Sequence, residues 1–134
     1  MTPEERKLHF EDIARRIVEL IETEKLYLNP RLVLKDIFPR MGYKRMTLSY
    51  AINNCLGVSF YTYINGLRLE EARRLIKENK GKKFLSTKYI AAASGFSSRC
   101  NYYRICMRMI GMSPTAWKLS LIGDQEANNE SITH

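Results

Sequence analysis

The 134-residue sequence predicts an all-α fold, in which a long linker helix joins two helix-turn-helix subdomains, with about seven helices in all. Apolar residues recur at helical spacing, and alternating runs of β-branched residues are absent. Features of one segment also recur 53 to 54 residues later. We expect residues 1–58 to hold an N-terminal helix and the first subdomain, 59–80 the linker helix, 81–122 the second subdomain, and 123–134 a disordered polar tail.

Five helices are predicted before residue 94, over about 3–25, 34–38, 46–56, 60–78 and 87–93. Thr2 supplies a capping hydroxyl for the first, Pro3 suits its first position, and Glu4 and Glu5 follow in the first turn. Pro39 is expected to shorten or kink the second, because proline lacks the amide hydrogen that an inner turn needs. Gly66 lies inside the linker helix and costs roughly 1 kcal/mol relative to alanine.

An internal repeat organises the chain into two similar copies. Each copy has a short helix, a glycine turn, a second helix, and a Gly-x-Ser exit followed by an aromatic residue. The offset changes from 53 to 54 residues within the glycine turn, so the second copy holds one extra residue there. The matched residues are Ile37, Gly42, Tyr43, Gly57, Ser59 and Tyr63 in the first copy, and Ile90, Gly95, Phe96, Gly111, Ser113 and Trp117 in the second. Such a unit is a helix-turn-helix, with glycine suited to the turn and the next aromatic residue fixing it in the core.

The second helix of the second copy divides into two faces. Ser97 or Ser98 is expected to cap its start, leaving free N–H groups for a bound phosphate. In a helix-turn-helix, this helix enters the major groove of DNA with its N-terminus first. The expected core face holds Tyr102, Ile105, Cys106 and Met109. The residues placed to reach base edges are Arg99, Cys100, Tyr103 and Arg104, and an arginine there can pair with guanine O6 and N7.

The corresponding helix of the first copy shows the same division with less charge. Its expected inner side holds Leu48, Ala51, Ile52 and Cys55. Its expected outer side holds Met46, Ser49, Tyr50, Asn53 and Asn54, with Lys44 and Arg45 at the entry. Methionine can lie against a thymine methyl group, and Ser49 or Asn53 can hydrogen-bond a base or a phosphate.

The charge pattern favours an anionic partner. The net charge is +8, and neither 37–69 nor 80–123 contains an aspartate or glutamate. The linker helix, about 19 residues at 1.5 Å each, is roughly 28 Å long, a little under the ~34 Å between successive major-groove faces. The two recognition helices are therefore expected to enter adjacent major-groove segments of double-stranded DNA.

Two segments resemble the DNA-binding domain of AraC/XylS-type bacterial transcription regulators. They are GVSFYTYINGLRLEEARRLI and IAAASGFSSRCNYYRICMRMIGMSPTAW, and the second, with its Gly-Phe and its Gly-Met-Ser-Pro, is the more specific. The resemblance covers about residues 10–120 and implies two helix-turn-helix subdomains acting at promoters. It implies base-facing roles for Met46, Ser49 and Tyr50, and for Arg99, Cys100, Tyr103 and Arg104. The sequence departs from the family at Cys106-Met107-Arg108, where a phenylalanine and two basic residues are usual.

Plainer interpretations stay open for several of these residues. Arg99 and Arg104 can be solvated surface, and Tyr50 and Tyr103 can cover a neighbouring helix. Met46 and Met107 can fill the core or meet a protein, and Cys100 can be a small contact residue. Lys80, Lys82 and Lys83 can be a solvated loop or contact phosphate. For the whole chain, the alternatives are a helical module that binds an acidic protein, with RNA polymerase as a candidate, and a non-specific nucleic-acid-binding protein.

Other functional classes have little support in the sequence. Three cysteines without CxxC spacing favour neither a disulfide framework nor a zinc site. The two histidines, His9 and His134, stand near the ends, and no phosphate-binding glycine loop or paired-carboxylate site is present. The start MTPEERKLHF lacks the apolar core of a signal peptide. We therefore expect a cytoplasmic protein with no enzymatic activity, cofactor, small-molecule site or membrane contact.

Overall fold

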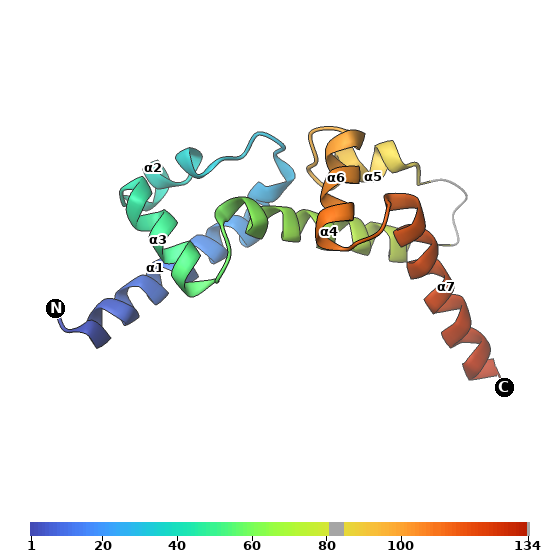
Figure 1. The fold of residues 1–134 in the computed structure, drawn as a ribbon, viewed down its shortest axis with the longest axis horizontal. Coiled ribbons are helices and arrows are strands. Elements are labelled where there is room, and N and C mark those ends of the chain that lie inside the picture. The colour runs from blue at the N-terminus through green and yellow to red at the C-terminus, as the bar shows by residue number, and fades with distance from the viewer. Residues whose placement is uncertain (81–84, 134) are drawn as a thin grey trace. The chain divides into compact units, whose positions relative to one another are not determined.

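The computed structural model describes residues 1–80 and 85–133, and the side chains of 1–80 and 85–123. Seven α-helices and two short 3-10 helices make up this part of the chain, without a strand, which confirms the predicted all-α class (Figure 1). In chain order they are α1 (Pro3–Thr23), η1 (Leu26–Leu28), η2 (Leu34–Asp36), α2 (Phe38–Met41), α3 (Arg45–Cys55), α4 (Phe60–Glu78), α5 (Thr87–Ala93), α6 (Arg99–Met109) and α7 (Pro114–Thr133). No helix of the described residues is long and apolar enough to cross a membrane.

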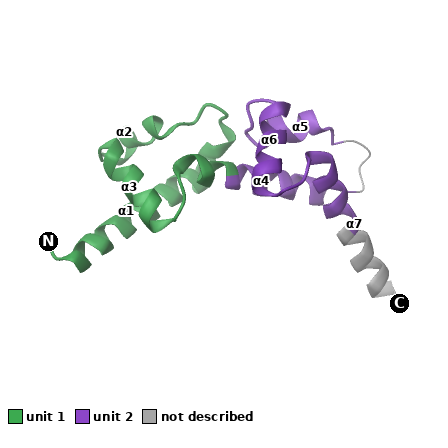
Figure 2. Cartoon of the chain, viewed as in Figure 1, with its two compact units in different colours: residues 1–65 green, residues 66–134 purple. Residues whose placement is uncertain are grey.

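The chain divides into two compact units, residues 1–65 and 66–134, each of which holds one copy of the repeat (Figure 2). The division falls inside α4, so this one helix contributes to both units. The α4 bounds agree with those predicted for the linker helix.

Helix starts follow the capping residues. The Thr2 hydroxyl accepts a hydrogen bond from the Glu5 amide at 3.1 Å, and the Glu5 carboxylate accepts one from the Thr2 amide at 3.2 Å. Pro39 was expected to shorten or kink a helix begun at Leu34, and it stands in the first turn of α2, after the short η2 has ended at Asp36. That position suits proline because a first-turn amide has no partner within the helix. The predicted second helix is therefore two short elements, η2 and α2.

The core of the first unit forms where α1 packs on α3. One stripe of α1, one side of α3, a residue from α4, and Leu34 of η2 with Ile37 directly after η2 are buried. Burying each large side chain stabilises the unit by roughly 1.5–3 kcal/mol. These residues are Ile13, Ala14, Ile17, Ile21, Leu34, Ile37, Leu48, Ala51, Ile52 and Ile64. The expected inner side of α3 is confirmed except at Cys55, which is exposed because it ends the helix, beyond the buried Ile52.

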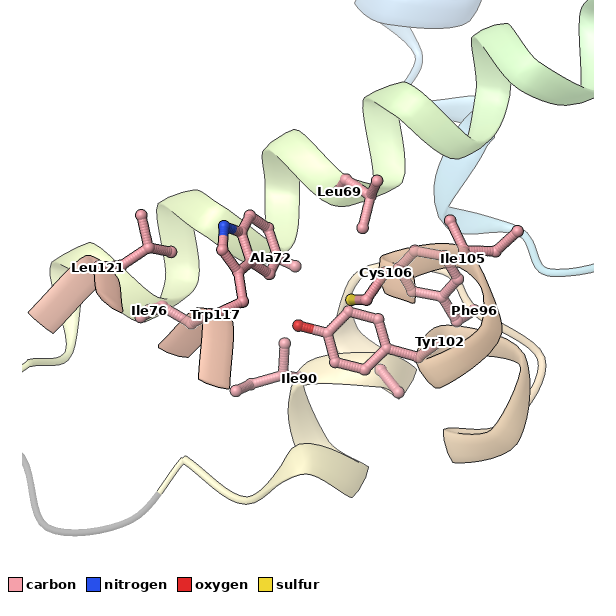
Figure 3. Packing of buried hydrophobic residues seen from close by; sticks show 11 residues of the cluster. Leu69, Ala72, Ile76, Ile90, Phe96, Tyr102, Ile105, Cys106, Trp117 and Leu121 are labelled. Atoms are coloured by element: carbon pink, nitrogen blue, oxygen red, sulfur yellow. The ribbon is translucent and has the colours of Figure 1, made fainter. Parts of the chain in front are cut away.

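The core of the second unit gathers side chains from α4, α5, α6 and α7 and from the turn between α5 and α6 (Figure 3). It holds Leu69, Ala72, Ile76, Ile90, Ala91, Phe96, Tyr102, Ile105, Cys106, Trp117 and Leu121. The rings of Phe96 and Tyr102 lie 4.9 Å apart between centroids, beside the small Cys106. Met109 was expected in this core but is 40 % exposed, since it is the last residue of α6.

The sequence repeat is also a structural repeat. All four repeated glycines take positive φ: Gly42 76°, Gly57 73°, Gly95 91° and Gly111 84°. Ser59 and Ser113 accept hydrogen bonds from the amides of Thr62 and Ala116, both at 3.2 Å, at the starts of α4 and α7. The helices α3 and α6 both have 11 residues. Their starts differ by 54 residues, so the extra residue lies in the turn, as predicted.

The turn aromatics differ between the copies. Phe96 is buried as expected, whereas Tyr43 is only half-buried and meets the edge of the His9 ring. At the other end, α7 extends to Thr133, where the sequence predicts a disordered tail from 123. The side chains from 124 onward lie outside the described residues, and so do Lys82 and Lys83.

Candidate nucleic-acid interface

The outer face of α6 is the more strongly charged of the two predicted surfaces. Ser98 caps the helix by accepting a hydrogen bond from the Asn101 amide at 3.0 Å, and Ser97 is exposed beside it. Arg99 and Cys100 follow as the first two helical residues, and both are exposed. One turn later, Tyr103 (51 % exposed) and Arg104 continue the same surface. All six α6-side residues of the predicted site therefore lie at the surface, where a partner could reach them.

The arginines of α6 are free of internal ion pairs. Within the described side chains, no carboxylate pairs with Arg99, Arg104 or Arg108, and residues 80–123 themselves contain no acid. Arginines of α1, α2 and α4 do form such pairs, among them Arg15, Arg16, Arg40, Arg73 and Arg74. The α6 face thus offers guanidinium groups whose donors are not already engaged by a carboxylate.

Two grooves flank the start of α6. One is lined by Arg99, Cys100 and Tyr103 together with hydroxyl-bearing residues from the starts of α5 and α7: Thr87, Ser113 and Thr115. The other lies between α5 and the turn, and its polar lining is Lys88, Ser97, Ser98 and Arg99. Hydroxyls and cations of this kind are typical contacts to the phosphates on either side of a groove-bound helix.

The outer face of α3 is exposed but less charged. Met46 is 84 % exposed, Lys44 and Arg45 are exposed, and Ser49 is half-buried. Lys44 takes the capping position without a side-chain hydrogen bond, unlike Ser98 in α6.

Tyr50 of α3 covers a neighbouring helix, as the plainer of its two interpretations expects, and its neighbour there is Phe10. Its ring lies 4.6 Å from that of Phe10 in α1, although half of the side chain stays exposed. Asn54 donates to the Tyr50 carbonyl at 2.9 Å. Tyr50 therefore covers a neighbouring helix and also presents an edge to solvent.

Cys55 and Cys106 have raised thiol pKa values, the opposite of what an activated nucleophile needs. Burial raises the pKa of the Cys106 thiol to about 11, although the nearby Tyr102 hydroxyl opposes the shift. Partial burial, and then the nearby Glu11 carboxylate, raise the pKa of Cys55. No group of three or more His, Cys, Asp or Glu in the described part of the chain could hold a metal ion.

Comparisons with known proteins identify this arrangement. A family model described as "Helix-turn-helix domain" matches residues 19–120, and this family is the helix-turn-helix of AraC-type regulators. The chain belongs to the AraC-type helix-turn-helix family. Members of this AraC-type family are DNA-binding transcription regulators and not a class of enzymes. No curated protein sequence matches the chain.

Two solved structures share the AraC-type fold. One is the C-terminal domain of AraT, a response regulator from Geobacillus stearothermophilus, with a TM-score of 0.70 and 23 % identity over 81 % of this chain and 84 % of that one. The other is the C-terminal domain of the two-component response regulator yesN from Fusobacterium nucleatum, with a TM-score of 0.65 and 20 % identity over 77 % of this chain and 98 % of that one. The resemblance seen in the sequence is therefore confirmed at the level of family and fold.

Membership of the AraC-type family does not assign individual contacts. The residues of α3 and α6 predicted to meet DNA stay predictions. One surface of this AraC-type domain escaped the sequence analysis: a groove between the first turns of α1 and the end of α3. One sequence feature could have indicated this groove: the cations Arg6 and Lys7 stand on the same face of α1 as the buried Ile13 and Ile17.

Proposed function

We propose that this domain binds specific double-stranded DNA sequences at promoters, with α3 and α6 inserted into adjacent major-groove segments. The observation that carries the proposal is the acid-free outer face of α6, where Arg99 and Arg104 are exposed and unpaired within the described residues. Such arginines can donate two parallel hydrogen bonds to guanine O6 and N7. The domain acts by binding and not by catalysis, in the bacterial cytoplasm, and RNA polymerase is a further candidate partner.

The α6 contacts divide by chemistry. Arg99 and Arg104 read base edges, while Tyr103 meets a base or a phosphate beside them. Cys100 is small enough to let the helix start approach the bases closely. Ser97 and Ser98 contact phosphate, which the free amides of the first turn also favour.

The proposed α3 contacts divide by chemistry in the same way, but fewer of them are charged. Met46 lies against a thymine methyl group, and Ser49 and Tyr50 hydrogen-bond at the groove edge. Lys44 and Arg45 neutralise phosphates at the entry of the helix. Since this unit has fewer free cations on its face, we expect it to add less affinity than the α6 unit.

Selection from random duplexes tests the proposal. Enriched sites should contain two motifs about one helical turn apart, because the two recognition helices are joined by α4. Failure to enrich any motif would contradict sequence-specific binding. Anisotropy titrations with duplex DNA, RNA and single strands over a salt series then separate the alternatives. Equal affinity for all three would indicate a non-specific nucleic-acid-binding protein, and no binding at all would favour a module for an acidic protein.

A further inference from the structure

The first turns of α1 form an arm beside the outer face of α3. Residues 1–9 are exposed, and the buried stripe of α1 begins only at Ile13. We call residues 3–10 the arm. A groove separates it from α3, with the arm contributing Pro3, Arg6, Lys7 and Phe10, and α3 contributing Tyr50 and Asn54. Both α3 residues also belong to the predicted DNA-facing side of that helix.

The arm continues the core stripe of α1 but changes its chemistry. Positions three and four residues apart share one face of a helix. Counting back from Ile17 and Ile13, that face passes through Phe10 and then reaches Arg6 and Lys7. Leu8, the apolar residue between Lys7 and Phe10, is instead 64 % exposed on another side of α1. The side of α1 that faces α3 thus turns from aliphatic to cationic where the core ends.

The two cations of the arm are available to an anion. Neither Arg6 nor Lys7 forms an ion pair with a described side chain, whereas Arg15 of the same helix pairs with Asp12 and Glu19. Glu5 is turned back to the Thr2 amide, and neither it nor Glu4 lines the groove. Glu11 is the one acid among the groove residues, and it lies near Cys55 at the end of α3.

Phe10 and Tyr50 tie the arm to the recognition helix. Their rings are 4.6 Å apart, and Phe10 is half-buried, so this contact fixes the arm at the edge of the α3 face. A duplex seated on α3 would bring its sugar-phosphate backbone past the same edge.

We propose that the arm is part of the DNA interface, and that Arg6 and Lys7 bind backbone phosphates flanking the α3 half of the site. The inference rests on the proposed function and deepens it. These contacts are electrostatic and independent of base sequence. They compensate for the sparse charge on the outer face of α3 itself.

The test compares salt slopes for Arg6→Ala, Lys7→Ala and the double variant on the selected duplex. The slope of log K against log salt is negative, and each phosphate contact that a variant removes should reduce its magnitude by about 0.9. Between 50 and 200 mM salt, the ratio of wild-type to variant affinity should therefore shrink about three- to fourfold for each phosphate that is no longer bound. Arg15→Ala is the matched control, since it removes a cation from the same helix that already pairs internally.

Truncating the duplex gives a second, independent measurement. Removing the base pairs that flank the α3 motif should weaken wild-type binding but leave the double variant unaffected, because the double variant no longer touches that flank. Two results would overturn the arm's role in DNA binding while leaving the proposed function intact. One is a salt slope that none of the three variants changes. The other is an equal loss of affinity on truncation in the wild type and the double variant. If the wild type bound no duplex, both would fail. The enriched motif should be the same for wild type and double variant, and a changed motif would overturn a phosphate role.

Discussion

At the scale of single residues, the arginines separate into two groups by their partners. Those of α1, α2 and α4 that form ion pairs, such as Arg40 with Glu24 and Arg74 with Glu71, are engaged by the protein's own carboxylates. Arg99 and Arg104 of α6 have no such partner among the described side chains. Exposed ion pairs add little to stability, so the contrast matters mainly for what the free arginines can bind.

Arg104 is expected to provide base discrimination as well as affinity. Arg104→Ala should weaken binding to the selected site by about 1–3 kcal/mol and relax preference at one base pair. Arg104→Lys keeps the charge but loses the planar pair of donors, so it should retain the salt slope and still relax that preference. Competition titrations with single-base variants of the site measure both effects. Equal losses on specific and random DNA would argue against base contact. As a control, Arg73→Ala on α4 should change neither the affinity for the selected site nor the base preference.

Tyr102 carries a buried polar atom in an apolar cluster. Its hydroxyl has no hydrogen-bond partner in the described residues, although the Cys106 thiol lies near enough to influence its pKa. Since an unsatisfied buried hydroxyl is costly, Tyr102→Phe should raise the free energy of unfolding by about 1 kcal/mol while keeping the contact with Phe96. Urea unfolding measures this, with Tyr103→Phe at the surface as a control that should stay within about 0.5 kcal/mol. A loss of stability would show that the thiol satisfies the hydroxyl.

At the scale of elements, the sequence predicted helices best where local rules are sufficient. The bounds of α4 and α5 agree with their predicted ranges, because each starts after a capping serine and has a clear apolar stripe. The region between Leu34 and Gly42 was mispredicted, because Pro39 suits a first turn as well as it disrupts an inner one. Cys55 and Met109 fit the apolar side of a helical wheel, but both stand last in their helices, where a wheel cannot show that the core has ended.

The glycines of α4 and of the repeat should respond to alanine in opposite directions. Gly66 is helical, and an added Cβ would meet the Met109 side chain only at ordinary contact distance, 3.9 Å. Gly66→Ala should therefore stabilise the protein by about 1 kcal/mol. Gly111 has a φ of 84° with nothing within 4 Å of an added Cβ, so Gly111→Ala should destabilise it by about 1–2 kcal/mol through backbone strain alone. Chemical denaturation of the two variants would reveal the sign, and a stabilising Gly111→Ala would contradict the left-handed turn.

The pair of Glu24 and Arg40 joins the end of α1 to α2 and should make the stability of the first unit depend on pH. Two hydrogen bonds at 2.8 and 2.6 Å link the groups, and these bonds lower the pKa of Glu24 below its ordinary 4.5. The folded state then binds fewer protons than the unfolded state, so the stabilisation is present above pH 4.5 and is lost as the pH falls below it. Urea midpoints of the wild type and Glu24→Gln should converge between about pH 5 and pH 3. Arg40→Gln should reproduce the same behaviour, and a constant difference across this range would show that the pair does not stabilise the fold.

At the scale of the whole molecule, the repeat decided the fold and much of the candidate site. Matched glycines and serines identified both helix-turn-helix units, and in the structure these residues form the left-handed turns and the helix caps. The arm was missed because Arg6 and Lys7 stand in an ordinary amphipathic helix start, where cations usually indicate a solvated face. The packing of Phe10 on Tyr50 shows that Arg6 and Lys7 lie beside α3.

At the scale of the whole molecule we also predict that α4, which contributes to both units, limits the spacing of the two proposed DNA motifs. Its 19 residues span roughly 28 Å at 1.5 Å per residue. Inserting about five base pairs between the motifs turns one of them to the opposite side of the duplex, since a helical turn takes about 10 base pairs. Affinity should then fall to that of a duplex whose α3 motif is scrambled, because only the α6 unit can still bind its own motif. Titrations over a series of insertions would test this. Affinity that does not change with spacing would mean that the two units bind independently, and that α4 does not set the distance between them.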